Sequence, residues 1–251
     1  MKFTVDSKIL INGLNDILMR GDYPNGASVS RRNLSASAYM VAQTNGLKLF
    51  NADLSTVCSV FIPLESVDDI GECAVAIDVF VDYLKTFKGD VTITIGDYAN
   101  IKTSNKTASF GIAIQHPNYA MIERLRTLTI PSDEMPKFGK NNTPFETKIT
   151  VMGDLLIDAA KGCDVLKTAT YKFDYDGESF TLSSNRGGSI QKYETVIDTI
   201  AVEGEQSTVE ITGAFSRIIG NTATIYLKDE FPVLMVSDNS MLLKAPYQAR
   251  R

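Results

Sequence analysis

Few side chains in this sequence could carry out catalysis or hold a metal ion. The only histidine, His116, directly precedes Pro117, and any Ser-His-Asp or Cys-His arrangement would have to use it. No serine lies in a G-x-S-x-G motif. The three cysteines, Cys58, Cys73 and Cys163, have no C-x-x-C spacing, which predicts no metal site. We therefore expect no catalytic residue, no metal and no cofactor.

Two short polar segments resemble ligand-binding loops. Residues 174–178, Asp-Tyr-Asp-Gly-Glu, look like the start of a calcium loop but lack the remaining ligand spacing. Residues 185–189, Asn-Arg-Gly-Gly-Ser, are glycine-rich, yet they contain no P-loop lysine and precede an expected strand. We interpret both segments as turns between strands.

The composition bounds the class of protein. The chain has 251 residues, a net charge of −5 and 44% hydrophobic residues, which fits two domains of ordinary size. The net charge speaks against a general nucleic-acid binder, but it says nothing about where charges lie. The odd number of scattered cysteines favours a reducing, intracellular compartment. Since the sequence opens on a strand pattern and has no apolar run of about 18 residues, we expect neither a secretory signal nor a membrane span.

Charged side chains remain as the candidates for function, and we consider those on four segments with helical periodicity. Seven basic residues lie there: Lys8, Arg20, Lys85, Lys88, Lys161, Lys167 and Arg217. Six acidic residues accompany them: Asp16, Asp78, Asp82, Asp154, Asp158 and Asp164. The helices thus carry a net charge of +1 (7 − 6), and the rest of the chain carries −6. This asymmetry permits a helical surface that faces phosphates, and it is equally typical of solvated helix faces.

The four helices occur as two pairs. Ser7 is the predicted N-cap of the first helix, whose apolar stripe is Leu10, Leu14, Ile17 and Leu18. The stripe of its counterpart is Leu156, Ala159, Ala160 and Cys163. Asp78 is predicted to cap a second helix over Val79–Lys88, which ends at Gly89. In the second half, Thr212 is predicted to cap a helix over Gly213–Ile219.

A repeat explains this pairing. Lys2-Phe3-Thr4-Val5 recurs as Lys148-Ile149-Thr150-Val151, 146 positions further on (148 − 2). Each copy leads into a helix, then strands, a second helix and further strands, so we predict a duplicated α+β domain. In the first copy, residues 63–71 are expected to form a turn. The predicted domains are residues 1–116 and 146–251.

Residues 117–145 are expected to form an extended connector between the domains. They contain four prolines, at positions 117, 131, 136 and 144, and show weak periodicity. Within them, Leu128-Thr129-Ile130-Pro131 is an apolar island. It is either a docking strip for a partner or a contact that attaches the connector to a sheet.

The order of these elements resembles the DNA polymerase sliding clamps, and among them the two-domain type of proliferating cell nuclear antigen and its archaeal and viral relatives. The resemblance covers nearly the whole chain. Its most specific local matches are residues 46–55 (GLKLFNADLS) and 231–236 (FPVLMV), with the connector residues 128–131 (LTIP) and the closing residues 242–246 (LLKAP). The match departs from the family in a less basic set of helices, with Asp154 and Asp158 where cations are expected, and in a basic tail over residues 247–251.

The resemblance implies a fold and a set of sites. Three two-domain subunits would close head to tail into a ring, with antiparallel sheets outside and paired helices inside. The ring would encircle duplex DNA and contact it independently of its sequence. The seven basic residues above would be the DNA-lining candidates. A partner peptide would bind in a pocket beneath the connector, matched here by Ala52, Asp53, Leu54, Val57, Leu128, Ile130, Pro131, Pro232, Ala245 and Pro246.

We therefore expect a homotrimeric processivity factor that tethers a replicative DNA polymerase and is loaded by an ATP-driven clamp loader. It would be intracellular, in the cytoplasm or nucleoid, in a nucleus, or in an infected host cell. One alternative is a subunit of a heteromeric replication or checkpoint clamp, and another is a viral processivity factor that does not close a ring. A hydrolase or transferase on a duplicated α+β scaffold is the alternative from a different class.

Overall fold

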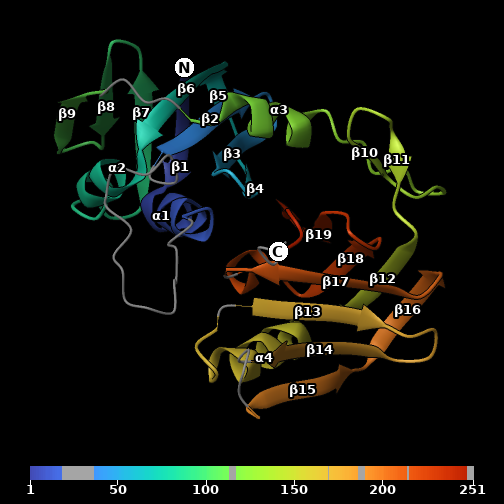
Figure 1. The fold of residues 1–251 in the computed structure, drawn as a ribbon. Coiled ribbons are helices and arrows are strands. Elements are labelled where there is room, and N and C mark those ends of the chain that lie inside the picture. The colour runs from blue at the N-terminus through green and yellow to red at the C-terminus, as the bar shows by residue number, and fades with distance from the viewer. Residues whose placement is uncertain (19–36, 113–116, 169, 186–189, 214, 248–251) are drawn as a thin grey trace. The chain divides into compact units, whose positions relative to one another are not determined.

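The two halves of the fold begin with equivalent strands, and buried side chains alternate with exposed or half-buried ones along both. Phe3 and Val5 are the buried positions of β1 (Lys2–Asp6), and Thr147, Ile149 and Val151 are those of β12 (Thr147–Met152). The computed structural model describes residues 1–18, 37–112, 117–168, 170–185, 190–213 and 215–247. It divides into unit 1, which holds the described residues up to Ile122, and unit 2, which holds those from Glu123 onward (Figure 1).

Unit 1 contains nine strands and two helices among its described residues. In chain order they are β1 (Lys2–Asp6), α1 (Ser7–Asp16), β2 (Ser37–Gln43), β3 (Gly46–Ala52), β4 (Thr56–Pro63), β5 (Val67–Asp69), β6 (Gly71–Ala76), α2 (Ile77–Leu84), β7 (Asp90–Ile95), β8 (Tyr98–Lys102) and β9 (Thr107–Gly111). A further helix, α3 (Tyr119–Arg126), crosses the division between the units.

Unit 2 begins with a small hairpin and then repeats the order of unit 1. Its described elements are β10 (Lys137–Phe138), β11 (Thr143–Pro144), β12 (Thr147–Met152), α4 (Gly153–Asp164), β13 (Thr170–Tyr175), β14 (Phe180–Asn185), β15 (Lys192–Ile197), β16 (Thr199–Gly204), β17 (Ser207–Thr212), the 3-10 helix η2 (Ser216–Ile218), β18 (Thr222–Leu227), β19 (Val233–Ser237) and β20 (Ser240–Lys244).

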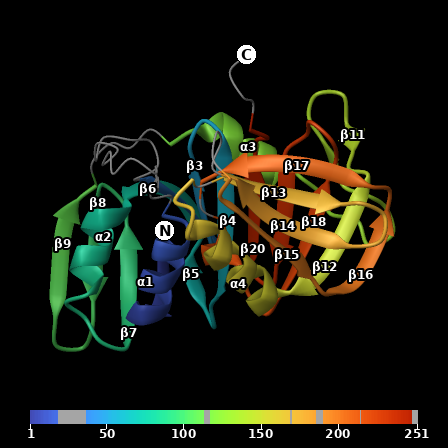
Figure 2. The same cartoon turned by 60° about the horizontal axis from the view of Figure 1, so that its bottom comes forward.

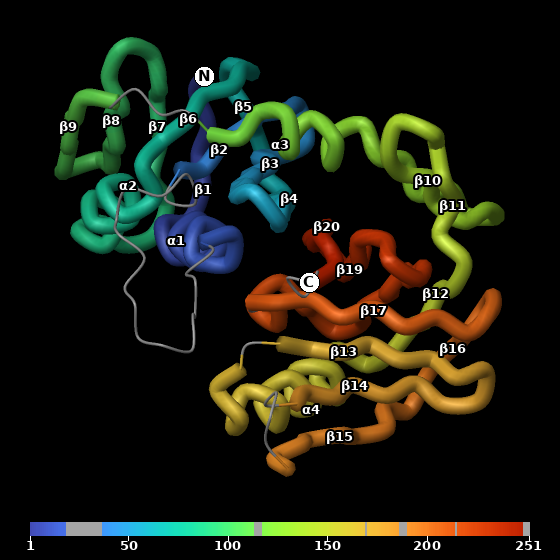
Figure 3. The backbone as a smooth tube through the Cα atoms, viewed as in Figure 1, coloured from blue at the N-terminus to red at the C-terminus, as the bar shows by residue number. Residues whose placement is uncertain are grey.

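The sheet topology confirms the duplication. In unit 1 the strands pair in the orders β5-β1-β7-β8-β9 and β4-β3-β2-β6, and in unit 2 in the orders β16-β12-β18-β19-β20 and β15-β14-β13-β17. Each strand of unit 1 thus has an equivalent strand at the same position in the strand order of unit 2. The pairings within these runs are antiparallel. Figure 3 follows the second run of unit 2, where α4 packs against β14 and β15.

The predicted helix stripes lie in the two cores. Leu10, Leu14 and Ile17 of the first stripe are fully buried, and α1 contacts β4 and α2. Leu156 and Cys163 of α4 are also buried. Burial of one apolar face against a sheet is the main source of stability for such short helices.

The predicted helix caps need correction. α1 is capped by Asp6, not Ser7, because the Asp6 carboxylate accepts hydrogen bonds from the backbone N–H groups of Lys8 (2.8 Å) and Ile9 (3.2 Å). α2 starts at Ile77, before Asp78, and its N-cap Ala76 makes no side-chain hydrogen bond. Asp78 instead lies in the first turn, where a carboxylate favours the positive end of the helix dipole.

The second helix of unit 2 is much shorter than predicted. Thr212 ends β17, and Gly213 has φ +81°, so the chain turns before the single 3-10 turn of η2. The buried residues Phe215, Ile218 and Ile219 are spaced i, i+3 and i+4, and one 3-10 turn satisfies this spacing as well as an α-helix does.

Some strands and the connector also differ from the expectation. The predicted turn over residues 63–71 contains β5, so five strands (β2 to β6) separate α1 from α2, as five strands (β13 to β17) separate α4 from η2. The connector is not extended throughout, because it contains α3. Asn118 starts this helix, accepting a hydrogen bond from Met121 N–H at 3.3 Å, and Ile122 and Leu125 are its buried positions.

The end of the connector is held to unit 2 by aromatic side chains. Phe145 is fully buried and contacts Phe231 edge to face, with ring centroids 5.3 Å apart. Phe138, on β10, contacts the same ring at 6.0 Å. These contacts fix the β10–β11 hairpin against the core of unit 2.

Candidate nucleic-acid interface and partner surface

The predicted DNA-binding residues of unit 1 lie at the surface of its helix pair. Lys8 is the second residue of α1, Lys85 follows α2 directly, and Lys88 lies three residues further on; all three are exposed. Ser7 N–H donates to the carbonyl of Gly89 at 2.9 Å. The start of α1 and the loop after α2 therefore adjoin, and Lys8 and Lys88 share one end of unit 1.

The predicted DNA-binding residues of unit 2 surround α4 and η2, which contact each other. Lys161, Lys167 and Arg217 are exposed. Lys167 has φ +54° in the turn after α4. Arg20 lies outside the described residues.

Two of the lysines on these helices already have acidic partners. Lys85 forms an ion pair with Asp82 at 3.0 Å, and Lys161 forms one with Asp158 at 2.9 Å. Both pairs are exposed and spaced i, i+3, so each contributes only a few tenths of a kcal/mol, of the order of 0.3–0.5. They nevertheless lower the net positive charge that these helix faces present to a phosphate.

The predicted peptide-pocket residues of unit 1 surround the turn between β3 and β4. The Asp53 carboxylate closes this turn by accepting the N–H groups of Ser55 and Thr56, each at 2.7 Å. Leu54, at its tip, is 86% exposed, whereas Ala52 and Val57 are fully buried beneath it. Only Asp53 and Leu54 of this group therefore offer surface to a partner.

The residues of unit 2 that were predicted to line the peptide pocket are partly exposed. Leu128, Ile130, Pro131, Pro232, Ala245 and Pro246 are all half-buried. Beyond them, Tyr247 N–H donates to the carbonyl of Glu210 at 2.6 Å, which ties the end of the described chain to β17.

The structure adds residues that the sequence patterns did not single out. The Asn118 side chain donates to the carbonyl of Asp53 at 3.0 Å, and Tyr119, half exposed, packs edge to face on Tyr39. The start of α3 is thereby fixed to the turn that carries Leu54. Asn118 followed by apolar residues at 122 and 125 is the sequence signal that would have predicted this helix.

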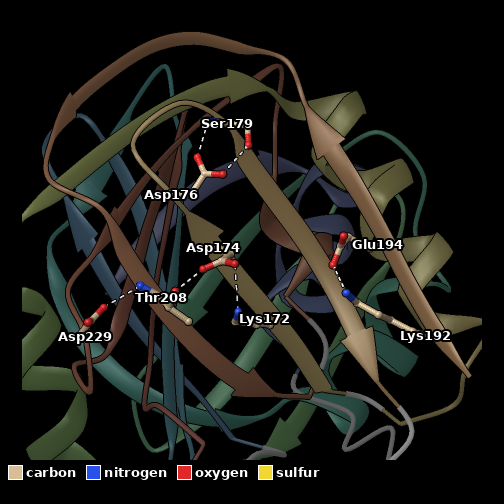
Figure 4. A network of polar contacts seen from close by, with 8 residues as sticks. All are labelled: Lys172, Asp174, Asp176, Ser179, Lys192, Glu194, Thr208 and Asp229. Atoms are coloured by element: carbon tan, nitrogen blue, oxygen red, sulfur yellow. Dashed lines mark hydrogen bonds and ion pairs between the residues drawn. The ribbon is translucent and has the colours of Figure 1, made fainter. Parts of the chain in front are cut away.

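A polar network with several carboxylates lies on the strands β15-β14-β13-β17 of unit 2 (Figure 4). Asp174 pairs with Lys172 at 3.0 Å and accepts a hydrogen bond from the Thr208 hydroxyl, and Glu194 pairs with Lys192. Burial raises the pKa of Asp174, but the bonds from Thr208 and Lys172 and the lysine charge outweigh it, so the net pKa lies below the ordinary value.

Asp176, in the same network, closes a hairpin turn. Its carboxylate accepts hydrogen bonds from the N–H groups of Ser179 (2.8 Å) and Glu178 (2.9 Å), which hold its pKa below the ordinary value. The turn predicted for residues 174–178 is present from Asp176 onward, whereas Asp174 and Tyr175 are the last residues of β13. Carboxylates whose pKa values are lowered are poor proton donors near neutral pH, so Asp174 and Asp176 are poor candidates for the acid of a hydrolase. Burial raises the pKa of Glu210, which lies opposite Lys172 in the β13–β17 pairing.

Other chemistry finds no support in the described part of the chain. No group of three or more His, Cys, Asp or Glu side chains there is placed to hold a metal ion. Burial raises the pKa of the Cys73 thiol to about 12 and that of Cys163 to about 11. Cys58 and Cys163 are buried, and Cys73 is half-buried. No described helix has the length and apolar character needed to cross a membrane. His116 and residues 186–189 fall outside the described residues.

The fold is similar to that of several DNA polymerase clamps. The DNA polymerase III beta chain of Streptococcus pneumoniae TIGR4 matches with a TM-score of 0.70 and 17% identity, over 99% of this chain and 65% of its own. A putative beta subunit from Eubacterium rectale ATCC 33656 has a TM-score of 0.73 and 15% identity, over 98% and 65%. A Helicobacter pylori beta clamp bound to a DNA ligase peptide has a TM-score of 0.67 and 14% identity, over 100% and 68%.

The likeness extends over part of the length of the matched proteins. The chain spans slightly less than two thirds of the length of the first two of these proteins. Neither a protein-family model nor a curated protein matches the sequence.

Proposed function

We propose that this chain, whose fold is that of the DNA polymerase sliding clamps, is itself a clamp. It would be a non-enzymatic processivity factor that encircles duplex DNA and tethers a polymerase to it. The observation that carries this proposal is the repeated strand order of the two units, together with clamp structures that match 98% or more of the chain. Two copies of one α+β unit, each with its helical elements in contact, form a natural segment of a ring.

We further propose that three copies close the ring head to tail. β9 and β15 each end a run of paired strands within their own unit. An end strand presents unpaired N–H and C=O groups, which natural proteins usually blunt with lysine, proline or very short strands. β9 (TASFG) has none of these, and Val196 on β15 is 64% exposed. Pairing of β9 with β15 of another copy would satisfy both edges, and a repeated head-to-tail contact closes a ring when its rotation permits.

The partner surface is proposed on the same basis. Leu54 at the tip of a fixed turn offers a large apolar side chain, and the half-buried residues from 128 to 131 offer more. Exposed apolar groups of this kind mark protein-binding sites. The H. pylori beta clamp holds a DNA ligase peptide. We propose that short apolar segments of a polymerase and of an ATP-driven loader bind this chain in a comparable way.

The weak basic character of the helices is consistent with sliding. A topological tether needs only a few sequence-independent phosphate contacts, and each contact is weakened by salt because binding releases counterions. A more basic lining would bind the duplex more tightly and make that binding more sensitive to salt.

Topological retention tests this function. Purified protein is incubated with a nicked circular plasmid, isolated by gel filtration, and compared before and after a restriction enzyme linearises the DNA. A clamp co-elutes with circles and is lost once the DNA has ends. Equal retention on circular and linear DNA would contradict encirclement, whereas retention on neither is the result expected of a closed ring that needs the ATP-driven loader proposed above.

A further inference from the structure

One end of unit 1 gathers three lysines from three separate segments. Lys8 is the second residue of α1, Lys88 lies in the loop before β7, and Lys106 lies in the turn between β8 and β9. We call these residues the basic corner. Ser7 N–H bonds to the Gly89 carbonyl at 2.9 Å, and Lys106 reaches the same loop. Figure 2 shows the starts of β7 and β9 at this end of the unit.

Lys106 is held in place rather than free in solvent. Its ammonium group donates to the carbonyl of Thr86 at 2.6 Å and lies 4.7 Å from the centroid of the Phe87 ring. An ammonium has three donors, so two remain for a ligand. Because its position is already fixed, Lys106 loses less side-chain freedom on binding an anion than an unconstrained lysine would.

Acidic neighbours of the corner are largely engaged elsewhere. Asp6 uses its carboxylate to cap α1, and Asp82 pairs with Lys85. Asp90, opposite Asp6 in the β1–β7 pairing, is exposed. Among the described residues, no carboxylate forms an ion pair with Lys8, Lys88 or Lys106.

The duplication supplies an internal comparison, because unit 2 has the same corner with the opposite charge. Asp154 is the second residue of α4, as Lys8 is of α1, and Gly153 N–H bonds to the Asn221 carbonyl at 2.7 Å, as Ser7 bonds to Gly89. In the β19–β20 turn, the Asp238 carboxylate accepts from Asn221 N–H at 3.0 Å. The turn therefore braces the loop with a carboxylate where unit 1 uses the Lys106 ammonium.

We infer that the basic corner of unit 1 is the phosphate-contact site of this chain, that Lys106 belongs to it, and that the equivalent corner of unit 2 does not bind phosphate. This inference rests on the proposed clamp function. It makes the DNA contact one-sided: each copy approaches the duplex backbone through unit 1, while Asp154 and Asp238 keep unit 2 from holding it. Lys85 and Lys161, which are already paired with aspartates, contribute little.

Salt dependence of DNA binding tests the inference on the full chain. Anisotropy of a labelled duplex oligonucleotide is measured across a salt series, since each phosphate contact contributes about 0.9 to the slope of log K against log salt. That slope is negative. The variant Lys8→Gln/Lys88→Gln/Lys106→Gln is expected to reduce its magnitude by about 2.7. Lys102→Gln is the matched control. Lys102 is exposed on β8, and its neighbour Ile101 is buried in the core, so the Lys102 side chain points to the opposite face of the sheet. The slope measured for this variant should equal that of the wild type.

Two more variants keep the test independent of folding. Lys8→Gln/Lys88→Gln retains the bond from Lys106 to Thr86 and should reduce the magnitude of the slope by about 1.8. Asp154→Lys, which copies Lys8 into unit 2, should increase that magnitude by about 0.9. If the wild-type chain binds DNA and the triple variant keeps the full slope, the basic corner is not the phosphate-contact site, while the proposed clamp function is unaffected. If the wild-type chain neither binds duplex nor is retained on circles, both the inference and the proposed clamp function are contradicted.

Discussion

At the scale of single residues, the end of α1 depends on a side chain from the neighbouring sheet. Asn51 is fully buried, and its amide group donates to the carbonyl of Ile17, the C-cap of α1, at 2.9 Å. Cys58, directly opposite Asn51 in the β3–β4 pairing, points its thiol at the same carbonyl at 3.7 Å. Helix-end carbonyls need such partners when they are buried.

Removing the Asn51 amide should therefore destabilise unit 1. Asn51→Ala leaves the Ile17 carbonyl with only the weak thiol donor, and loss of a buried hydrogen bond of this kind costs about 1–3 kcal/mol. The free energy of unfolding, measured with urea, reports the change. Asn12→Ala, on the exposed face of α1, is the control; an equal effect of the two substitutions would contradict the capping role.

Asp174 should make stability depend on acid. Its folded pKa lies below the ordinary value of 3.8, so its contribution is fully present above that pH and is lost as the pH falls through the lower, folded value. Asp174→Asn should reduce stability at pH 7 and flatten the loss of stability below about pH 4. Urea midpoints at pH 7 and pH 3 check this. Asp97→Asn, in the exposed β7–β8 turn, should leave the pH profile as it is.

At the scale of elements, the sequence predicted apolar stripes better than element ends. The stripes of α1 and α4 were correct because burial of one face leaves a strong periodic signal. The caps were wrong because Asp6 and Ser7 are both good N-caps, and only the end of β1 decides between them. α3 was missed because prolines at 117 and 131 dominate its surroundings, although they lie outside the helix. Lys106 could not be predicted, since its contact with Thr86 joins segments 20 residues apart.

The packing of α4 on β15 depends on a residue without a side chain. A Cβ at Gly162 would overlap the ring of Tyr193. Gly162→Ala gains about 0.5–1 kcal/mol of helix propensity, but overpacking costs about 1–3 kcal/mol. We therefore expect net destabilisation by urea unfolding. At Gly96 nothing lies within 4 Å of an added Cβ, so Gly96→Ala should be close to neutral. A Gly162→Ala variant as stable as the wild type would contradict the tight contact.

At the scale of the whole molecule, the duplication was readable from a tetrapeptide repeat, because two copies of one domain keep their core strand even when other positions diverge. The assembly was not readable in the same way. Which strands end each run of pairing follows only from the topology, and the sequence marks β9 and β15 merely as alternating segments.

The exposed edge of unit 2 should govern self-association. Val196 on β15 is 64% exposed, and Val196→Lys places a charge where lysine normally protects an edge. This variant should stay folded but dissociate at concentrations where the wild type is assembled, which sedimentation velocity detects. Ile70→Lys, at a similarly exposed position (61%) between β5 and β6 of unit 1, is the control. Unchanged assembly of the Val196 variant would place the interface elsewhere.

The mass of the wild-type chain in solution tests the central claim most directly. Multi-angle light scattering from low to high micromolar protein should detect a species of three times 27.5 kDa, about 82 kDa. A homotrimer at that mass is the ring that the two repeated units and their open edges predict. A species that stays at 27.5 kDa across the whole range would contradict a closed ring made from this chain alone.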